Sequence, residues 1–209
     1  MKENILKIRK QINENTKLVV VTKKQSISNI KKIYSYGERD FGENRVQELI
    51  QKQQVLPSNI NWHLIGRLQS NKVKLIAPFI HLIQSVDSIK LLEKINKYAN
   101  LNNRNIDCLI QIKISSDTAK SGFSIEDALD FFNSNFENHF PHIKIRGIMC
   151  IGTLTKNFET TKREFMDMKN LLKKTNLKNP ILSMGMSNDY ILACQSGSNM
   201  IRIGSLIFK

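Results

Sequence analysis

Two adjacent lysines, Lys23 and Lys24, close the apolar run KLVVVTKKQ at residues 17–25. A lysine at the end of a buried strand is usually solvated, but an amine held in a pocket can also form an imine with an aldehyde. Side chains alternate along a strand, so Lys23 shares a face with Val19 and Val21, and Lys24 lies on the other face. Only one of the two lysines can therefore enter a barrel lumen, and alternation alone does not say which.

Two later segments carry the glycines and hydroxyls of a phosphate site. SMGMSND contains Gly185 and Ser187, and IRIGS contains Gly204 and Ser205. Glycine permits close approach of the backbone, and the free N–H groups of a following helix attract an anion. Gly and Ser in a loop also form ordinary turns, so either segment alone is a weak signal. A phosphate cradle opposite a strand-end lysine is an arrangement suited to pyridoxal phosphate, whose aldehyde forms an imine with an amine.

These residues stand at the ends of short apolar runs that alternate with helical patterns. The predicted strands are Leu18–Thr22, Arg39–Gly42, Trp62–Ile65, His81–Val86, Cys108–Ile114, Ile143–Ile151, Ile181–Met184 and Met200–Phe208. Such alternation indicates a parallel sheet covered by helices, which is an α/β fold. Strands buried on both faces look alike in a closed barrel and in an open doubly wound sheet. The count of eight favours the closed (β/α)8 barrel.

Helices are predicted between the strands, and a further one over about residues 2–15. Helical spacing of apolar residues is clear in the segments 27–34 and 89–99. Plausible N-caps are Ser26, Asn44, Ser70, Asp87-Ser88, Ser124 and Ser187-Asn188. Because no long linker, repeat or low-complexity segment interrupts the alternation, residues 1–209 are predicted to form one domain.

The composition is that of a globular protein, with 41% hydrophobic and 24% charged residues in a chain of 209. The first residues interleave charges with apolar positions, unlike a secretory signal, and no run is long enough to span a membrane. We therefore expect a cytoplasmic protein. The net charge of +14 raises nucleic-acid binding as an alternative, but the lysines are spread along the chain without a basic block. A bias toward Asn, Ile and Lys, expected of an A+T-rich genome, explains the charge more simply.

The cysteines and histidines show no metal-ligand spacing. The cysteines are Cys108, Cys150 and Cys194, and the histidines are His63, His81, His139 and His142. Scattered cysteines in odd number fit a reducing compartment, and no CxxC pair is present. The spacing therefore predicts no metal site.

The motifs, taken in order, resemble those of a known family. LVVVTK, FGENRVQEL, WHLIGRLQSNK, SVDS, AKSGF, SMGMSNDY and IRIGS look like the successive motifs of the pyridoxal phosphate homeostasis proteins. These proteins are small single-domain relatives of the barrel domain of alanine racemase. The resemblance extends from about residue 17 to residue 208, and the combination of motifs is highly specific. It implies a fold-type III (β/α)8 TIM barrel with no second domain, which holds pyridoxal 5'-phosphate as an internal aldimine.

The resemblance also implies a role for each matching residue. Lys23 ends LVVVTK and would form the Schiff base. Ser187 and the backbone of Gly204 and Ser205 would hold the phosphate. Arg202 would face the pyridine nitrogen, and because arginine stays protonated it cannot donate a full proton to that nitrogen. The ring would then be a poorer electron sink than one paired with a carboxylate.

Four further residues would lie near the cofactor ring by the same resemblance. Asn44 of FGEN, His63 of WHLIG and Met184 of SMGMS would line the pocket, and Lys120 of AKSGF would be a further neighbour. The chain departs from the usual motifs in four places. It has TK for SK, Arg67 where His is common, no acidic residue shortly before KSG, and an end at IFK where relatives generally continue.

Two functions are compatible with the resemblance. One is a monomeric, non-catalytic carrier or buffer of pyridoxal phosphate, whose expected partners besides the cofactor are cofactor-dependent apo-enzymes. The other is an amino-acid racemase of the alanine type, which uses a catalytic tyrosine from a partner subunit and an added β domain. The four tyrosines are Tyr34, Tyr36, Tyr98 and Tyr190, all in predicted helices or their starts. Phe208 is predicted to end the last strand, leaving no second domain, so a carrier without catalytic residues is favoured.

Overall fold

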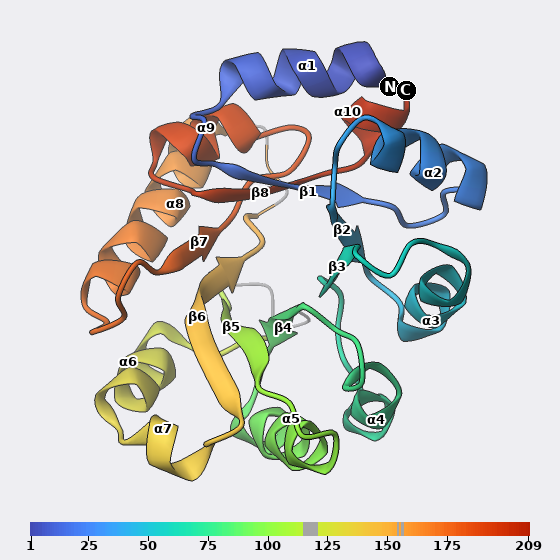
Figure 1. Cartoon of the computed structure of the whole chain (residues 1–209). Helices are drawn as coiled ribbons and strands as arrows, with labels where there is room; N and C mark the ends of the chain where they lie inside the picture. Colours follow the sequence, from blue (N-terminus) through green and yellow to red (C-terminus); the bar gives the residue numbers. More distant parts are fainter. Residues whose placement is uncertain (115–120, 154, 156) are drawn as a thin grey trace.

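Eight parallel strands close into a barrel in chain order, with helices around it (Figure 1). This computed structural model describes residues 1–209 apart from residues 115–120, 154 and 156. The strands are β1 (Lys17–Val21), β2 (Asp40–Glu43), β3 (Asn61–Leu64), β4 (Leu82–Val86), β5 (Ile106–Ile112), β6 (Ile143–Cys150), β7 (Ile181–Ser183) and β8 (Met200–Ile203). β1 pairs with β8 as well as with β2, which confirms the closed barrel and excludes the open doubly wound sheet.

Helices cover the outside of the barrel. They are α1 (Lys2–Gln11), α2 (Ile27–Ser35), α3 (Val46–Val55), the 3₁₀ helix η1 (Ser70–Lys72), α4 (Val73–Ile76), α5 (Ile89–Leu101), α6 (Ile125–Asn133), α7 (Phe136–His139), α8 (Phe158–Lys173), α9 (Tyr190–Gln195) and α10 (Ser205–Phe208). α1 lies across one side of the barrel near α9 and α10, and the two ends of the chain meet there (Figure 1). The side-chain amide of Asn4 donates to the carbonyl of Ile207, which ties α1 to α10.

The strands are almost continuously apolar because both faces are buried. Outward side chains join the helices in the main core, whereas Val19, Leu82, Leu109, Met149 and Met200 form a separate cluster inside the barrel. Bulky apolar side chains in layers normally fill the lumen of such a barrel. The position of Val19 in this inner cluster confirms that its face of β1 is the lumen face.

The last predicted strand is wrong in its second half. β8 ends at Ile203, and residues up to Phe208 form the short helix α10 instead of continuing the strand. Gly204 separates the two, and the apolar residues beyond it pack by helical turns, with Ile207 fully buried. A short apolar run does not distinguish a strand from a buried helical turn, which is the physical reason for the error.

Helix boundaries agree with the expected caps in three cases. The side chains of Ser26, Ser88 and Ser124 each accept a hydrogen bond from the backbone three residues on. The first helix ends at Gln11, earlier than expected, and α3 and α9 begin after Arg45 and Asp189. Within the described residues, no helix has the length and apolar character needed to cross a membrane.

Candidate functional site at the carboxyl ends of the strands

Arg202 is the central charged group inside the barrel. It lies on β8 with only 4% of its surface exposed, although it is a permanent cation. Its guanidinium donates to the Ser183 carbonyl (2.9 Å), to Ser183 Oγ (2.6 Å) and to the Cys150 carbonyl (2.7 Å). All three acceptors are neutral, and no carboxylate of the described residues forms an ion pair with it. Burial lowers the pKa of Arg202, and the charge of Asp189 opposes that shift. The site therefore contains a buried positive charge that is hydrogen-bonded but not neutralised.

Two serine hydroxyls meet beyond the ends of β7 and β8. Ser187 Oγ and Ser205 Oγ are 2.9 Å apart, and Ser205 is exposed. The turn that presents Ser187 is closed by Asp189, whose carboxylate accepts from the backbone N–H of Met186 at 2.6 Å. Gly204 precedes Ser205, and a Cβ there would lie 3.0 Å from the Val21 carbonyl of β1. The sequence analysis predicted that Ser187, Gly204 and Ser205 act together, and the structure brings Ser187 and Ser205 into contact.

Gly185 allows the chain to make this turn. Its φ is +97°, in a region that residues with a Cβ rarely adopt. A Cβ at this position would also lie 2.6 Å from the Cβ of Ala193 in α9. The turn after β7 therefore requires glycine for two independent reasons, one conformational and one steric.

Lys23 lies in a turn immediately beyond β1. The strand ends at Val21, and a hydrogen bond of 3.0 Å from Gln25 N to the Thr22 carbonyl closes the turn. Lys24 has a φ of 60°, and its backbone N–H donates to Glu48 of α3. Strand alternation consequently stops before the lysines, so it cannot by itself assign Lys23 to the lumen. The Lys23 side chain is exposed at the carboxyl end of the barrel, the face to which Ser205 also belongs.

A buried ion pair on the outer side of the barrel supports the turn that carries Lys23. Lys52 of α3 donates to Glu43 at 2.5 Å and to the Thr22 carbonyl at 2.8 Å. The Thr22 hydroxyl donates to the same Glu43 oxygen at 2.6 Å. Lys52 and Glu43 are both buried, which makes this contact a rigid attachment of the turn to α3. Burial raises the pKa of Glu43, and the hydrogen bond from Lys52 opposes that rise.

Asn44 immediately follows β2. Its Oδ1 is buried and has no hydrogen-bond partner within the described part of the chain. Gly66 lies against it so closely that a Cβ on Gly66 would be 2.3 Å from the Asn44 carbonyl. A buried acceptor without a partner costs free energy, so Asn44 is a group to which a ligand could supply a donor.

His63 lies in the lumen, below the mouth of the barrel, which is the opening at the carboxyl ends of the strands. Its Nδ1 is 3.0 Å from Gln84 Nε2, and Gln84 in turn accepts from Ser183 Oγ at 2.7 Å. His63 is therefore connected to Arg202 by a chain of hydrogen bonds rather than placed next to it. Its Nε2 faces Asp40 at the opposite end of the barrel, at 3.0 Å.

Met184 and Lys120 are the remaining residues predicted to lie near the cofactor ring. Met184 is fully buried in the main core outside the barrel, because its neighbour Ser183 occupies the lumen face. Lys120 lies outside the described residues. Arg67 lines a neighbouring surface cavity of about 810 Å³ between the starts of α3 and α5, and its nearest ion-pair contact is Asp87 at 4.0 Å.

Sequence reasoning missed Gln84, Ser183 and the carbonyl of Cys150. These groups hold Arg202 and link it to His63. A signal for two of them was present, since Gln84 and Ser183 are polar residues inside otherwise apolar strands. The Cys150 carbonyl carried no such signal, because any residue supplies a backbone acceptor. Burial raises the pKa of the Cys150 thiol to about 12, so that thiol stays protonated.

The fold and site define the class to which the barrel belongs. The sequence model of the family described as alanine racemase, N-terminal domain, matches residues 1–209. An alanine racemase of Clostridium difficile has the same fold, with a TM-score of 0.78 at 15% identity; the alignment covers 99% of this chain and 56% of that one.

Within that class, the chain belongs to the family of pyridoxal phosphate homeostasis proteins. It is 39% identical over 202 residues to the member from Helicobacter pylori, covering 92% of this chain and 87% of that protein. The Haemophilus influenzae member is 38% identical over 205 residues, covering 94% and 86%. PipY of Synechococcus elongatus, solved without and with pyridoxal phosphate, is 32% identical, with TM-scores of 0.90 and 0.89 and coverage of 100% of this chain and 99% of PipY. The predicted family is thereby confirmed.

Proposed function

We propose that this protein binds pyridoxal 5'-phosphate as a Schiff base on Lys23 and serves as a non-catalytic carrier or buffer of the cofactor. The observation that carries the proposal is the contact between the hydroxyls of Ser187 and Ser205, at the end of the barrel that bears Lys23. The buried cation Arg202 lies on the strand that leads into Ser205. Membership of a family named for pyridoxal phosphate homeostasis, and a relative solved with the cofactor, support the same conclusion.

Three features of the structure fit this cofactor. The hydroxyls of Ser187 and Ser205, with the N–H groups at the start of α10, can hold a phosphate. Arg202 has only neutral hydrogen-bond acceptors, so an electron-rich ring nitrogen would be a further favourable neighbour for its charge. Asn44 has a buried amide oxygen without a partner among the described residues. When bound, the cofactor would supply an electrophilic aldehyde, and Lys23 would be the residue that offers it an amine.

The arrangement favours binding of the cofactor without catalysis. Arg202 retains its own protons, so it cannot protonate the ring nitrogen in the way that a carboxylic acid can. A racemase also needs a second base on the other face of its substrate. Two of the tyrosines are engaged elsewhere, since Tyr34 bonds Asn59 at 2.8 Å and Tyr190 bonds Gln11 at 2.5 Å. These contacts support the carrier over the alanine-type racemase.

The proposal also covers the oligomeric state, the cellular location and the partners of the protein. We infer a monomer that works in the cytoplasm, where its free cysteines would stay reduced. Its partners would be the cofactor and cofactor-dependent apo-enzymes that receive it. Nucleic-acid binding is not part of the proposal, because the positive charge is distributed along the whole chain.

A titration with pyridoxal phosphate tests the proposal. The protein should develop the absorbance of a protonated Schiff base, as should Lys24→Ala, because Lys24 is the matched exposed amine next to the site. Lys23→Ala should lose this absorbance while keeping its circular dichroism. A Schiff-base band that persists in Lys23→Ala would overturn the assignment, and sustained turnover of L- to D-alanine by the intact protein would replace the carrier with the racemase.

A further inference from the structure

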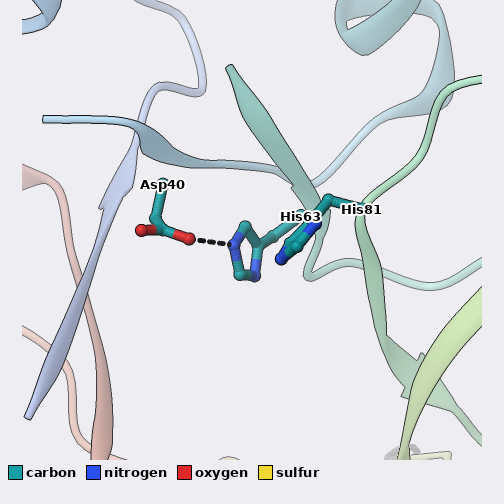
Figure 2. A group of neighbouring side chains, drawn as sticks. All are labelled: Asp40, His63 and His81. Carbon is teal, nitrogen blue, oxygen red and sulfur yellow. Dashed lines mark hydrogen bonds and ion pairs between the residues drawn. The ribbon is translucent and has the colours of Figure 1, made fainter. Parts of the chain in front are cut away.

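Two histidines and an aspartate meet at the end of the barrel opposite the cofactor site. Asp40 begins β2, His63 lies on β3, and His81 immediately precedes β4. Figure 2 shows the carboxylate of Asp40 directed at the His63 ring, with the His81 ring alongside. The centroids of the two imidazole rings are 5.5 Å apart. These residues are far apart in the chain, which is why their spacing gave no sign of a cluster.

We propose that Asp40, His63 and His81 form a binding site for one divalent transition-metal ion, of which Zn²⁺ is the representative. One ligand atom from each of the three residues lies within 4.8 Å of the others. Imidazole nitrogens together with a carboxylate oxygen are an established ligand set for zinc, with water in the remaining position. The site is independent of the carrier function and lies at the other end of the lumen.

The geometry requires only a small closure around the ion. With metal–ligand bonds of about 2.0–2.1 Å, two ligands of a tetrahedral zinc ion are about 3.4 Å apart. Asp40 Oδ1 and His63 Nε2 already lie 3.0 Å apart. His63 is fully buried and fixed, whereas His81 is exposed and can rotate to close the remaining gap. Neither ring nitrogen of His81 is hydrogen-bonded to any described residue, so both are free to act as ligands.

The proton on His63 can be relocated to suit a metal ion. Nε2 can bind an ion only when Nδ1 carries the ring proton, and Nδ1 faces the side-chain amide of Gln84. Rotation of that amide by half a turn presents its oxygen to Nδ1 and its nitrogen to Ser183 Oγ. Gln84 then acts as the outer partner that orients a metal-bound histidine.

The charges around the site set its affinity. Lys17 of β1 lies 3.4 Å from Asp40 Oδ1 and is the cation that a metal ion would displace. Its side chain is 43% exposed, so it can swing into solvent. The charges of Asp107 and Arg104 also act on His81 in opposite senses, and Asp107 is partly neutralised by Arg146 at 3.5 Å.

Calorimetric titration of ZnCl₂ into the full chain, cleared of metal with a chelator at pH 7, tests the proposal. The expected result is binding of one ion per chain. His81→Ala should weaken it by at least about tenfold, because even the loss of an outer partner costs about 10–100-fold. Lys17→Met should tighten it by about two- to fivefold, the equivalent of a partly exposed ion pair of about 0.5–1 kcal/mol. His139→Ala, which removes an exposed histidine on α7, is the matched control and should leave the affinity unchanged.

Each outcome of this titration decides for or against the site. His81 and Lys17 are largely exposed, so both variants should stay folded, which circular dichroism checks. An unchanged affinity in His81→Ala would mean that zinc binds elsewhere, for instance at Cys194, and would overturn the proposal. Absence of binding by the unsubstituted protein would show that the contact between Asp40 and His63 is a hydrogen bond only.

Discussion

The most informative single residue of the site is Arg202. A buried guanidinium is tolerated when its donors are paired, and here two carbonyls and a hydroxyl accept from it. Because none of these acceptors carries a charge, the residue keeps an unbalanced positive charge next to the mouth of the barrel. In the proposed function this charge would face the cofactor ring, and because arginine retains its protons the residue itself would limit the chemistry available to the cofactor.

Gly185 gives a prediction at the scale of one residue. Gly185→Ala should destabilise the protein by about 2–4 kcal/mol, because the new Cβ meets Ala193 at 2.6 Å and the backbone stays at positive φ. Gly37→Ala is the matched control, since Gly37 has a similar φ of +101° but open space around its Cβ position. It should cost only about 1 kcal/mol. Urea unfolding of both variants measures the difference, and equal losses would contradict the steric part of this account.

Individual site residues were predictable only where the chemistry depends on residue type at a strand end. Ser187 and Ser205 were paired from their place in two glycine-containing junctions, and the structure brings their hydroxyls together. For Met184 the pocket position stays a prediction, because a motif does not show which way a side chain faces, and in the structure this side chain packs in the main core. For Lys23, alternation along β1 could not decide the face, because the strand ends at Val21 and a turn follows.

Among the elements, α3 contributes to the site without reaching the mouth. Its Lys52 holds Glu43 of β2 and the Thr22 carbonyl, so one helix fixes the turn that carries Lys23. The backbone position of the Lys23 turn therefore depends on a contact on the outer side of the barrel. A site built on rigid elements in this way positions its groups more narrowly than a free loop can.

Removal of one partner of this buried pair should be costly. Lys52→Met is expected to destabilise the protein by about 3–5 kcal/mol, because it leaves the Glu43 carboxylate buried without its cation. The double variant Lys52→Met with Glu43→Gln should recover much of that loss, since no buried charge remains. Chemical unfolding of the two single variants and the double variant measures this coupling. Strictly additive losses would show that the two residues do not act as a pair.

The order of elements was predictable from the sequence to a large extent. Even the weak run at Arg39–Gly42 corresponds to a strand, β2, because a parallel barrel requires a strand between the consecutive outer helices α2 and α3. The residues after Gly204 were wrongly predicted to continue the strand, because their short apolar run is compatible with a strand as well as with the helix that they form. The pattern of apolar residues indicates the secondary structure of a long segment, whereas tertiary packing determines whether a short apolar segment is a strand or a helical turn.

At the scale of the whole molecule, the barrel has two polar ends joined through its core. Arg202, Ser183, Gln84, His63 and Asp40 form a continuous chain of hydrogen bonds from the mouth to the opposite end. Apolar residues, including Leu109 and Met149, fill the rest of the lumen. This chain of hydrogen bonds could not be predicted, because it joins residues from strands that are distant in the sequence.

The buried histidines make overall stability depend on pH. Burial lowers the folded-state pKa of His63 and His81 below the ordinary value of 6.5, so below that pH the unfolded chain binds more protons. The free energy of unfolding should therefore fall as the pH decreases from 7.5 to 5.5, by up to about 1.4 kcal/mol per pH unit for the fully buried His63 and by less for His81, which is exposed. Urea unfolding across this range measures the slope. His63→Gln should flatten it, and a slope unchanged by that substitution would exclude His63 as its source.

The central claim is that one amine, on Lys23, holds the cofactor. Incubation with pyridoxal phosphate, reduction with borohydride and peptide mapping test it most directly, because reduction fixes the imine wherever it formed. The account predicts a phosphopyridoxyl mass on Lys23, with Lys24 unmodified although it is the adjacent exposed amine. A modification on Lys24, or on no lysine at all, would contradict it.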